Sequence, residues 1–518
     1  MSAAADTQVR DRWGSKAGFI LAAMGSAIGL GNIWRFPYVV YENGGGAFLI
    51  PYFIAIATAA LPILILEYAL GHKYQTGAPF AFRGIRKAWE SLGWFQVLVS
   101  FVIATYYTVI LGWCLSYIVF SFGRQWGDDT EGFFISKYLG TSADGDPSGF
   151  WDVGGLRLDV LLPVLVAWGL IFWILKRGVS RGIELASKVL MPALIIMLVI
   201  IVVRAVTLDG AMTGLNVLFT PDFGALSDPG VWIAAYGQVF FSMSIAFSIM
   251  IAYSSYLPRK TDLANSGAIV GLSNAGFEFL AAIGVFGVLG FLAAAQGAEV
   301  TEVAGNGGIG LAFIAFPQII NTLPGLNAVF GVLFFGTLFF AGLTSAVSIL
   351  ECVIAAVREK FGASRTTAVS VVVGAAALVS LLYVTRGGLF YLDTVDHFFN
   401  NFGLVISGLL EVILVAWIAR QLGPLRDHVN ATSYLRVGTG WTISLAVITP
   451  VLLLVMTLYN LWNEIREPYE GYPRSGLLAL GWLLVLAAVV LAFLASRIRD
   501  RGPAWLAAGS TSPAAEME

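Results

Sequence analysis

One short stretch places small, polar and charged residues inside an apolar run that is long enough to cross a membrane. It runs from Gly25 to Pro37 and reads GSAIGLGNIWRFP, with three glycines in seven residues. Each glycine weakens a helix by about 1 kcal/mol relative to alanine. Backbone groups that leave a helix at membrane depth must find partners in protein, water or a bound ion. The stretch therefore predicts a broken helix at which an ion or a small substrate binds.

A second apolar run, at residues 237–248, places hydroxyl groups and an amide among aromatic side chains. It reads GQVFFSMSIAFS. The two runs lie in the first and the sixth apolar segments of the chain. That spacing is expected when spans one to five and six to ten form the two halves of an inverted repeat. The halves share little visible sequence, so only the spacing indicates the repeat.

Composition and segment length indicate the elements that hold these runs. The chain has 518 residues, of which 58% are hydrophobic and 12% charged, and its mean hydropathy is +0.80. Soluble proteins carry about twice that share of charge. The sequence therefore predicts an all-α polytopic membrane protein with 12 transmembrane helices of about 20 residues or more. They lie near residues 15–38, 46–70, 92–122, 158–175, 184–206, 231–257, 266–295, 326–357, 367–384, 395–419, 438–461 and 475–496.

The distribution of charge predicts the orientation. The net charge of −2 argues against nucleic acid as a partner. Of the 30 Lys and Arg residues, 22 lie in the connections on the side of the N-terminus. The positive-inside rule then predicts a protein integral to the plasma membrane, the inner membrane in a bacterium, with both termini cytoplasmic. The polar opening segment lacks a signal-peptide layout, so the first span is expected to be retained. Cys114 and Cys352 fall inside spans, so no disulfide is expected in the outside loops.

Several motifs in one order resemble those of the neurotransmitter:sodium symporter family, most closely its bacterial amino-acid transporters. They are RDRW at 10–13, GSAIGLGNIWRFPY at 25–38, ENGGGAFLIPY at 42–52, TYY at 105–107, GVWIAAYGQVFFSMS at 230–244 and FFAGLTSAVSI at 339–349. The resemblance implies a 5+5 inverted-repeat transporter fold with discontinuous helices 1 and 6 and two extra C-terminal helices. The implied divisions are a cytoplasmic segment at 1–14, repeats at 15–206 and 207–420, two helices at 421–499, and a cytoplasmic tail at 500–518.

The resemblance also implies a function, namely sodium-coupled import of a neutral amino acid by alternating access. Two alternatives stay open: a transporter of another small zwitterion with a carboxylate or sulfonate, and a non-transporting amino-acid sensor on the same scaffold. An enzyme has less support, because His72, His397 and His428 are not paired for metal binding and no nucleophile elbow or phosphate loop appears. The expected partners are sodium ions, a small neutral amino acid and the lipid bilayer.

Two sodium sites are implied by the resemblance, and sodium as a hard cation prefers oxygen ligands. The first site would comprise the Ala27 carbonyl, Asn32, Ser242, Asn274 and the substrate carboxylate. The second would comprise the carbonyls of Gly25, Ile28 and Ala341 and the hydroxyls of Thr344 and Ser345. Taken singly, the small and hydroxyl residues are explained by helix packing and local hydrogen bonds. Together with two asparagines inside spans, where polar groups are expensive, they favour ion binding.

The substrate is expected between the same two breaks. A half-helix that starts after the first break would direct amide groups at a substrate carboxylate. The implied substrate-binding residues are Ala27, Gly29, Gly31, Ile103, Tyr107, Phe241, Ser242, Ser244, Phe247, Ser345 and Ile349. Biogenic-amine members of the family carry Asp at the position of Gly29, so the glycine favours a substrate with its own carboxylate. Ala246, Ser248 and Ser348 replace smaller residues of leucine-transporting members, which is expected to shrink the cavity and raise its polarity.

Charged residues match two gates of the family. On the extracellular side the implied gate residues are Arg35, Asp396 and, beneath them, Gln238. On the cytoplasmic side they are Arg10, Trp13, Ser255, Tyr256 and Glu359. Gly182 and Pro192 resemble a motif for partial unwinding of span five, which would open a water path to the second sodium.

Glu278 is implied to be a fixed or protonatable negative charge that removes the need for chloride. It follows Asn274 by four residues, which places both on one helix face beside the first sodium site. The ordinary alternative is a glutamate that is hydrogen-bonded within the bundle.

Overall fold

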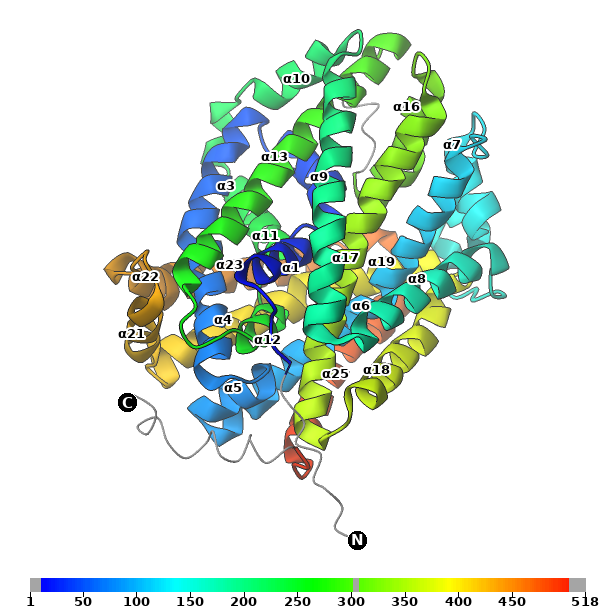
Figure 1. The fold of residues 1–518 in the computed structure, drawn as a ribbon. Coiled ribbons are helices and arrows are strands. Elements are labelled where there is room, and N and C mark those ends of the chain that lie inside the picture. Colours follow the sequence, from blue (N-terminus) through cyan, green and yellow to red (C-terminus); the bar gives the residue numbers. More distant parts are fainter. Residues whose placement is uncertain (1–10, 301–306, 503–518) are drawn as a thin grey trace.

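The protein is a bundle of helices (Figure 1), and the computed structural model describes residues 11–300 and 307–502. In this part of the chain, ten helical segments are long and apolar enough to cross a membrane. One further span consists of α1 (Lys16–Ala27) and α2 (Gly31–Glu42), which are bent by 52°. Another is broken into α11 (Pro229–Ser242) and α12 (Ile249–Ser255). The predicted all-α fold, with discontinuous helices 1 and 6, is confirmed.

The ten unbroken segments follow the predicted spans closely. They contain α3 (Leu49–Ala55) with α4 (Leu61–Tyr74), α6 (Glu90–Ser121), α8 (Leu158–Lys176), α9 (Leu185–Val206), α13 (Leu263–Gln296), α17 (Asn327–Phe361), α18 (Arg365–Ser380), α19 (Gly388–Phe398) with α20 (Val405–Ile413), α22 (Thr439–Ile443) with α23 (Thr449–Arg466), and α24 (Arg474–Gly476) with α25 (Leu483–Arg497). Shorter helices in the connections are α5 (Ala78–Ile85), α7 (Thr130–Gly132), α10 (Ala211–Phe219), α15 (Gly308–Gly310), α16 (Phe316–Thr322) and α21 (Leu422–Thr432).

Polar residues fix where several helices begin. Ser15 precedes α1 and its hydroxyl accepts the amide of Gly18. Asp228 precedes α11 and Asp262 precedes α13, and each carboxylate accepts an amide of the first turn. Such caps satisfy the amide groups that a helix start leaves without partners. The broken sixth span therefore has a defined start as well as a defined interruption.

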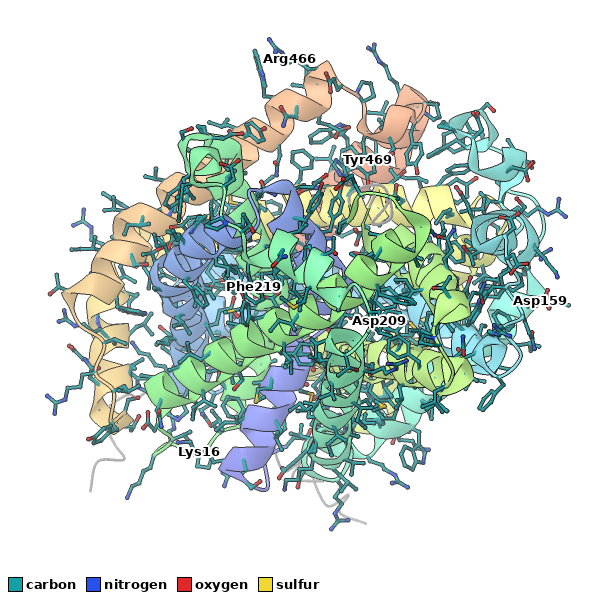
Figure 2. The ribbon with its side chains drawn as sticks, turned by 90° about the horizontal axis from the view of Figure 1, so that it is seen from above. Lys16, Asp159, Asp209, Phe219, Arg466 and Tyr469 are labelled. Atoms are coloured by element: carbon teal, nitrogen blue, oxygen red, sulfur yellow. The ribbon has the colours of Figure 1, made fainter. Side chains whose placement is uncertain are left out.

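The helices differ in how deeply they are buried. Side chains fill the interior of the bundle, and Asp159 and Arg466 lie at its rim (Figure 2). The apolar window of α17 is 94% buried, whereas that of the segment containing α25 is 28% buried. Apolar side chains that face outward are expected where a helix contacts lipid. Thus α17 is a central helix to which the site can be attached, and α25 is peripheral.

Both ends of the described chain lie on one face of the bundle. The Asp11 carboxylate pairs with Arg358, and the Asp500 carboxylate lies 2.8 Å from the Lys360 ammonium. Arg358 and Lys360 belong to the last turn of α17. We call this face the termini side and the other the opposite side.

Candidate functional site

The first break forms a bend at the centre of the bundle. The chain leaves α1 at Ala27 and enters α2 at Gly31, and the amides of Ile33 and Trp34 both donate to the Leu30 carbonyl. A Cβ at Gly31 would lie 2.5 Å from the Phe241 ring, so a larger residue there would displace the ring. The predicted break is confirmed, and the N-terminus of α2 faces the space beside Phe241.

The second break is a segment of six residues between α11 and α12. Ser244, Ala246 and Ser248 have φ angles of +51°, +65° and +60°, a region that costs residues other than glycine about 1–2 kcal/mol. Hydrogen bonds from neighbouring helices hold this backbone. The Ala246 amide donates to Glu67 at 2.7 Å, and the Ser100 hydroxyl donates to the Phe247 carbonyl at 2.6 Å.

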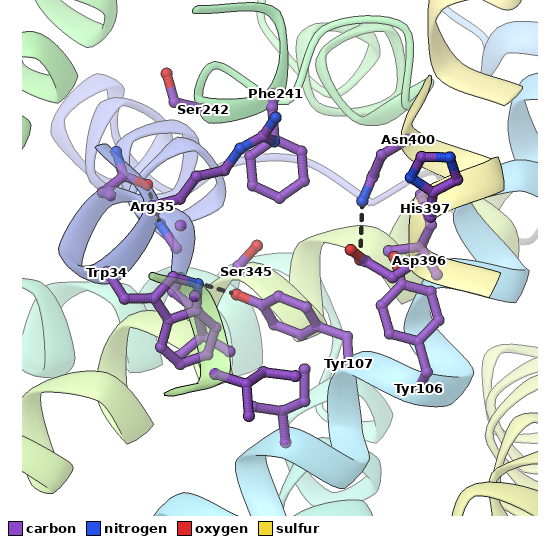
Figure 3. A pocket seen from close by; sticks show the side chains of 18 of the residues that line it. Trp34, Arg35, Tyr106, Tyr107, Phe241, Ser242, Ser345, Asp396, His397 and Asn400 are labelled. Carbon is purple, nitrogen blue, oxygen red and sulfur yellow. Dashed lines mark hydrogen bonds between the residues drawn. The ribbon is translucent and has the colours of Figure 1, made fainter. Parts of the chain in front are cut away.

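The two breaks border one cavity of about 530 Å³. All eleven residues predicted for the substrate site line it. Tyr107 and Ser345 face it from α6 and α17, and Phe241 faces it from the end of α11 (Figure 3). The structure therefore brings together residues that are up to 322 positions apart, from Ala27 to Ile349.

Tyr107 connects this cavity to the first break. The Leu30 amide donates to the Tyr107 hydroxyl oxygen at 3.2 Å (dashed in Figure 3). A phenol hydroxyl also has one proton to donate, and this contact does not use it. A Cβ at Gly29 would lie 3.0 Å from the same oxygen, so a larger residue would crowd the hydroxyl.

The cavity differs from the sequence-based expectation at both ends. Ser248 and Ser348 do not line it: the Ser348 hydroxyl donates to the Thr344 carbonyl and receives the Tyr253 hydroxyl. Their hydroxyls therefore do not make the cavity more polar. Toward the opposite side the cavity continues past residues that sequence reasoning missed, namely Tyr106, Asp393, His397, Asn400, Asn401, Tyr469 and Glu470. Asp393 lies two residues before the predicted span 395–419 but inside the observed span Gly388–Ile418, so its carboxylate became a signal only once the span was extended.

Oxygen atoms gather beside the cavity at the predicted first sodium site. The Asn32 amide nitrogen donates to the Asn274 oxygen at 2.8 Å, and the Asn274 nitrogen lies 3.3 Å from the Ser242 hydroxyl. The Asn32 oxygen accepts the Gly29 amide at 2.9 Å. These contacts show that the three side chains from α2, α11 and α13 meet, as the prediction required.

The residues predicted for the second sodium site also converge. A Cβ at Gly25 would lie 3.0 Å from Cβ of Thr344, so α1 and α17 approach closely. The Thr344 hydroxyl lies 3.0 Å from the Ala341 carbonyl. Ile28 lies directly after α1, and Ser345 follows Thr344 and lines the cavity. Carbonyl and hydroxyl oxygens from two helices therefore adjoin the first break.

Glu278 is fully buried on α13, one turn after Asn274. One carboxylate oxygen accepts the Gln238 amide at 2.7 Å, and the other is bonded to the Tyr52 hydroxyl. Gln238, predicted as part of a gate, thus contacts Glu278 rather than lining the cavity. A carboxyl group therefore lies on the same helix face as Asn274, a residue of the predicted first site.

The opposite side of the cavity is not closed by its predicted ion pair. The Arg35 guanidinium lies 4.9 Å from the centre of the Phe241 ring, and Asp396 accepts the Asn400 amide at 2.8 Å. Across the part of the chain that the structure describes, no ion pair joins Arg35 to Asp396. Both side chains line the cavity instead, so it extends between them.

The termini side is closed by contacts of the residues predicted for the cytoplasmic gate, which we call the latch. The Trp13 indole donates to the Tyr253 carbonyl at 2.8 Å, and Glu359 accepts the Gly77 amide at 2.9 and 3.0 Å. The Ser255 hydroxyl bonds within its own helix, to the Ala252 carbonyl. Arg10 lies outside the described residues.

A larger ionic network at the latch was missed from the sequence. Arg365 donates to both oxygens of Glu351, at 3.0 and 2.7 Å, and the Tyr256 hydroxyl donates to Glu351 at 3.0 Å. Asp11 joins the network through Arg365 at 3.1 Å and through Arg358. Glu351 is fully buried, and its place inside an apolar span was the available signal.

Comparison with known proteins identifies the family. The model of the sodium:neurotransmitter symporter family matches residues 10–129 and 124–500. The chain is 40% identical over 485 residues to an uncharacterized sodium-dependent transporter of Methanocaldococcus jannaschii, covering 94% of this chain and 97% of the relative. It is 31% identical over 530 residues to the human sodium- and chloride-dependent taurine transporter, covering 95% and 84%. It matches the crystal structure of MhsT in complex with L-phenylalanine with a TM-score of 0.70 and 32% identity, over 87% of this chain and 100% of that chain.

These matches extend over both broken helices and the cavity between them. They confirm the 12-helix fold and the resemblance predicted from the sequence motifs. The protein is a sodium-dependent transporter embedded in a membrane, and it is not an enzyme. The chain belongs to the sodium:neurotransmitter symporter family.

Proposed function

We propose that this protein imports a neutral amino acid together with sodium by alternating access. The observation that carries the proposal is the cavity between the two breaks, where the Tyr107 hydroxyl and the start of α2 meet. A hydroxyl that accepts a backbone amide and keeps its own proton is suited to a carboxylate. The start of a helix favours the same negative group.

The other cavity walls support a neutral substrate side chain. Among the lining residues, those from the two breaks, α6 and α17 are uncharged; the aliphatic and aromatic ones include Ile103, Phe247 and Ile349. The charged lining residues come from α2, α19 and the loop that precedes α24. A charged side chain in an apolar cavity without a partner would be strongly disfavoured. The solved relative MhsT is in complex with L-phenylalanine, which fits a neutral amino acid.

A second candidate substrate is a small zwitterion of another class. Similar proteins include taurine transporters and a GABA transporter of rat and human, about 30% identical to this chain. A sulfonate or a distant carboxylate could use the same Tyr107 hydroxyl. A non-transporting sensor would bind these ligands without moving them.

Two sodium ions would drive the import. The Asn32, Ser242 and Asn274 cluster supports a first site, with the Ala27 carbonyl and the substrate carboxylate as further ligands. Gly25, Ile28, Ala341, Thr344 and Ser345 support a second. At 100 mV each sodium supplies ~2.3 kcal/mol, and a tenfold gradient adds ~1.4, so two supply ~7 kcal/mol.

We further propose that Glu278 makes transport independent of chloride and that both termini are cytoplasmic in the plasma membrane. Glu278 lies one turn from Asn274 and has no positively charged partner among the hydrogen bonds of the described residues. A sodium ion nearby would gain from this charge. The repeats at 15–206 and 207–420 and the division at 420/421 stay predictions.

Uptake into proteoliposomes tests the proposal. The purified protein is offered twenty amino acids, taurine and GABA with an inward gradient of sodium or potassium, in chloride or gluconate. A neutral amino acid should accumulate only with sodium and equally well in both anions. Uptake that persists in potassium would overturn symport. Preference for taurine or GABA would favour the second candidate, and sodium-dependent binding without uptake would favour the sensor.

A further inference from the structure

Span five begins with an irregular turn that contacts the first half of span one. A π-helical segment, η7 (Val179–Glu184), follows Gly178 and leads into α9. The segment contains Gly182, whereas Pro192 lies inside the regular helix α9. A Cβ at Gly182 would overlap the Ile174 carbonyl at the end of α8, so the turn packs tightly there. Beside it, α9 packs along α1 (Figure 1).

Glu184, the last residue of η7, binds the start of α1. One carboxylate oxygen accepts the Gly14 amide at 2.6 Å, and the other accepts the Ser15 hydroxyl at 2.8 Å. Ser15 is also the N-cap of α1, since its oxygen accepts the Gly18 amide at 3.0 Å. Glu184 is 2% exposed, and Lys188, one turn later, holds its carboxylate at 2.7 Å.

The start of α1 is shaped to receive this carboxylate. A Cβ at Gly18 would overlap the Glu184 side chain, and a Cβ at Gly14 would lie 2.8 Å from the Ser180 hydroxyl. Gly14, Ser15 and Gly18 thus form a notch at the start of α1 into which η7 inserts a charged group. Hydrogen bonds to a charged group are stronger than neutral ones.

The same span places a second contact over the candidate second sodium site. Met191 is fully buried, and its sulfur lies 3.1 Å from where a Cβ at Gly25 would be. Thr344 contacts the same position at 3.0 Å. Glu184 and Met191 are seven residues apart, about two helical turns, so they lie on one face of span five.

We propose that Glu184 is a positioning residue for transport, which holds the first half of span one closed until span five moves away. Because Glu184 and Met191 lie on one face of span five, a displacement of this part of the span would break the contacts of Glu184 with Gly14 and Ser15 and would move Met191 away from Gly25. This inference rests on the proposed alternating access and assigns a residue to its inward-opening step.

A cysteine reporter on α1 tests the proposal. Ala22 lies between Gly18 and Gly25 and is 1% exposed, and the two native cysteines are buried. The Ala22→Cys protein is labelled with a hydrophilic thiol reagent in sodium and in potassium, and labelling of the parent without the reporter is subtracted. Glu184→Gln keeps the shape of the side chain but loses its charge. We expect it to raise the labelling rate in sodium roughly tenfold.

Two further variants separate loss of the Glu184 contact with α1 from general damage to the protein. Gly18→Ala keeps every charge but fills the notch, so it should raise labelling in the same direction, and the double variant should add little. Asp159→Asn makes the same acid-to-amide change at an exposed carboxylate and should leave labelling unchanged. If Glu184→Gln and Gly18→Ala label at the rate of the reporter alone, Glu184 does not hold α1 closed. Each variant is compared with the reporter protein in the same salt, so this outcome does not depend on sodium coupling. A reporter rate that is equal in sodium and potassium would instead contradict the proposed sodium coupling.

Discussion

Replacing Tyr107 by Phe tests whether the cavity recognises a carboxylate. The substitution removes one hydroxyl from a side chain that is 9% exposed and keeps its ring. In the proposed complex the hydroxyl donates to the substrate carboxylate, and a hydrogen bond to a charged group is worth about 1.5–3 kcal/mol. Loss of that bond corresponds to a roughly 10- to 150-fold lower affinity. The Leu30 amide also loses its acceptor, which affects every ligand alike.

Binding of an amino acid and of its carboxamide to both proteins separates these two effects. The neutral amino acid that transport favours, and its carboxamide, are each titrated in sodium against wild type and Tyr107→Phe. Wild type should bind the carboxamide much more weakly than the amino acid. In the variant, this ratio of affinities should fall by about tenfold or more. Tyr106→Phe, which changes the adjacent residue lining the same cavity, is the matched control and should keep the discrimination. An equal loss for acid and carboxamide in Tyr107→Phe would refute carboxylate recognition by this hydroxyl.

The remaining predictions address the ions, the second break and the termini side. Asn32→Ala should raise the sodium concentration needed for half-maximal binding without unfolding the protein; unchanged sodium dependence contradicts the first site. Glu278→Ser should transport more slowly or require chloride. A variant that transports at the wild-type rate in both chloride and gluconate would show that Glu278 is only structural. Ser248→Gly should stabilise the protein by about 1–2 kcal/mol, measured by thermal unfolding, because it relieves a positive φ and removes a buried hydroxyl without a partner. Burial and nearby positive charges lower the pKa of His428 to about 4, and its ring lies 2.9 Å from His72. Folding therefore favours the neutral form of His428. The stabilisation that results should be lost as pH falls from about 6.5 toward 4. His428→Gln should flatten that pH dependence of the melting temperature, and an unchanged slope would exclude His428 as its source.

Local sequence patterns were sufficient to predict the broken helices. Glycines at 25, 29 and 31 and polar groups at 242–248 disfavour a continuous helix in these two spans. Backbone exposed to lipid must be helical, so a break at this depth must be surrounded by protein or line a cavity. The structure places the breaks at Ala27–Gly31 and Ser242–Ile249. The family motifs then specified which residues from distant spans meet in one cavity. Neither step required knowledge of how neighbouring helices are rotated.

Interactions between side chains of different spans were harder to predict. Ser348 was expected to face the substrate, yet it bonds to Tyr253 and to its own helix. Its direction depends on the rotation of α17 against α12, which periodicity does not give for a helix buried on nearly all sides. The pairing of Glu351 with Arg365 was missed for the same reason. A charged residue inside a span signals that a partner exists but not which one.

The two sides of the cavity differ in how they are held, and this difference constrains the transport cycle. On the termini side buried Glu351 pairs with Arg365, and opening this side must separate the two charges. On the opposite side Arg35 and Asp396 line an open cavity without pairing. Alternating access requires two states within a few kcal/mol of each other. The free energy needed to open the termini side must therefore be offset by interactions that form on the opposite side, and an Arg35–Asp396 pair formed around bound substrate would supply one of them.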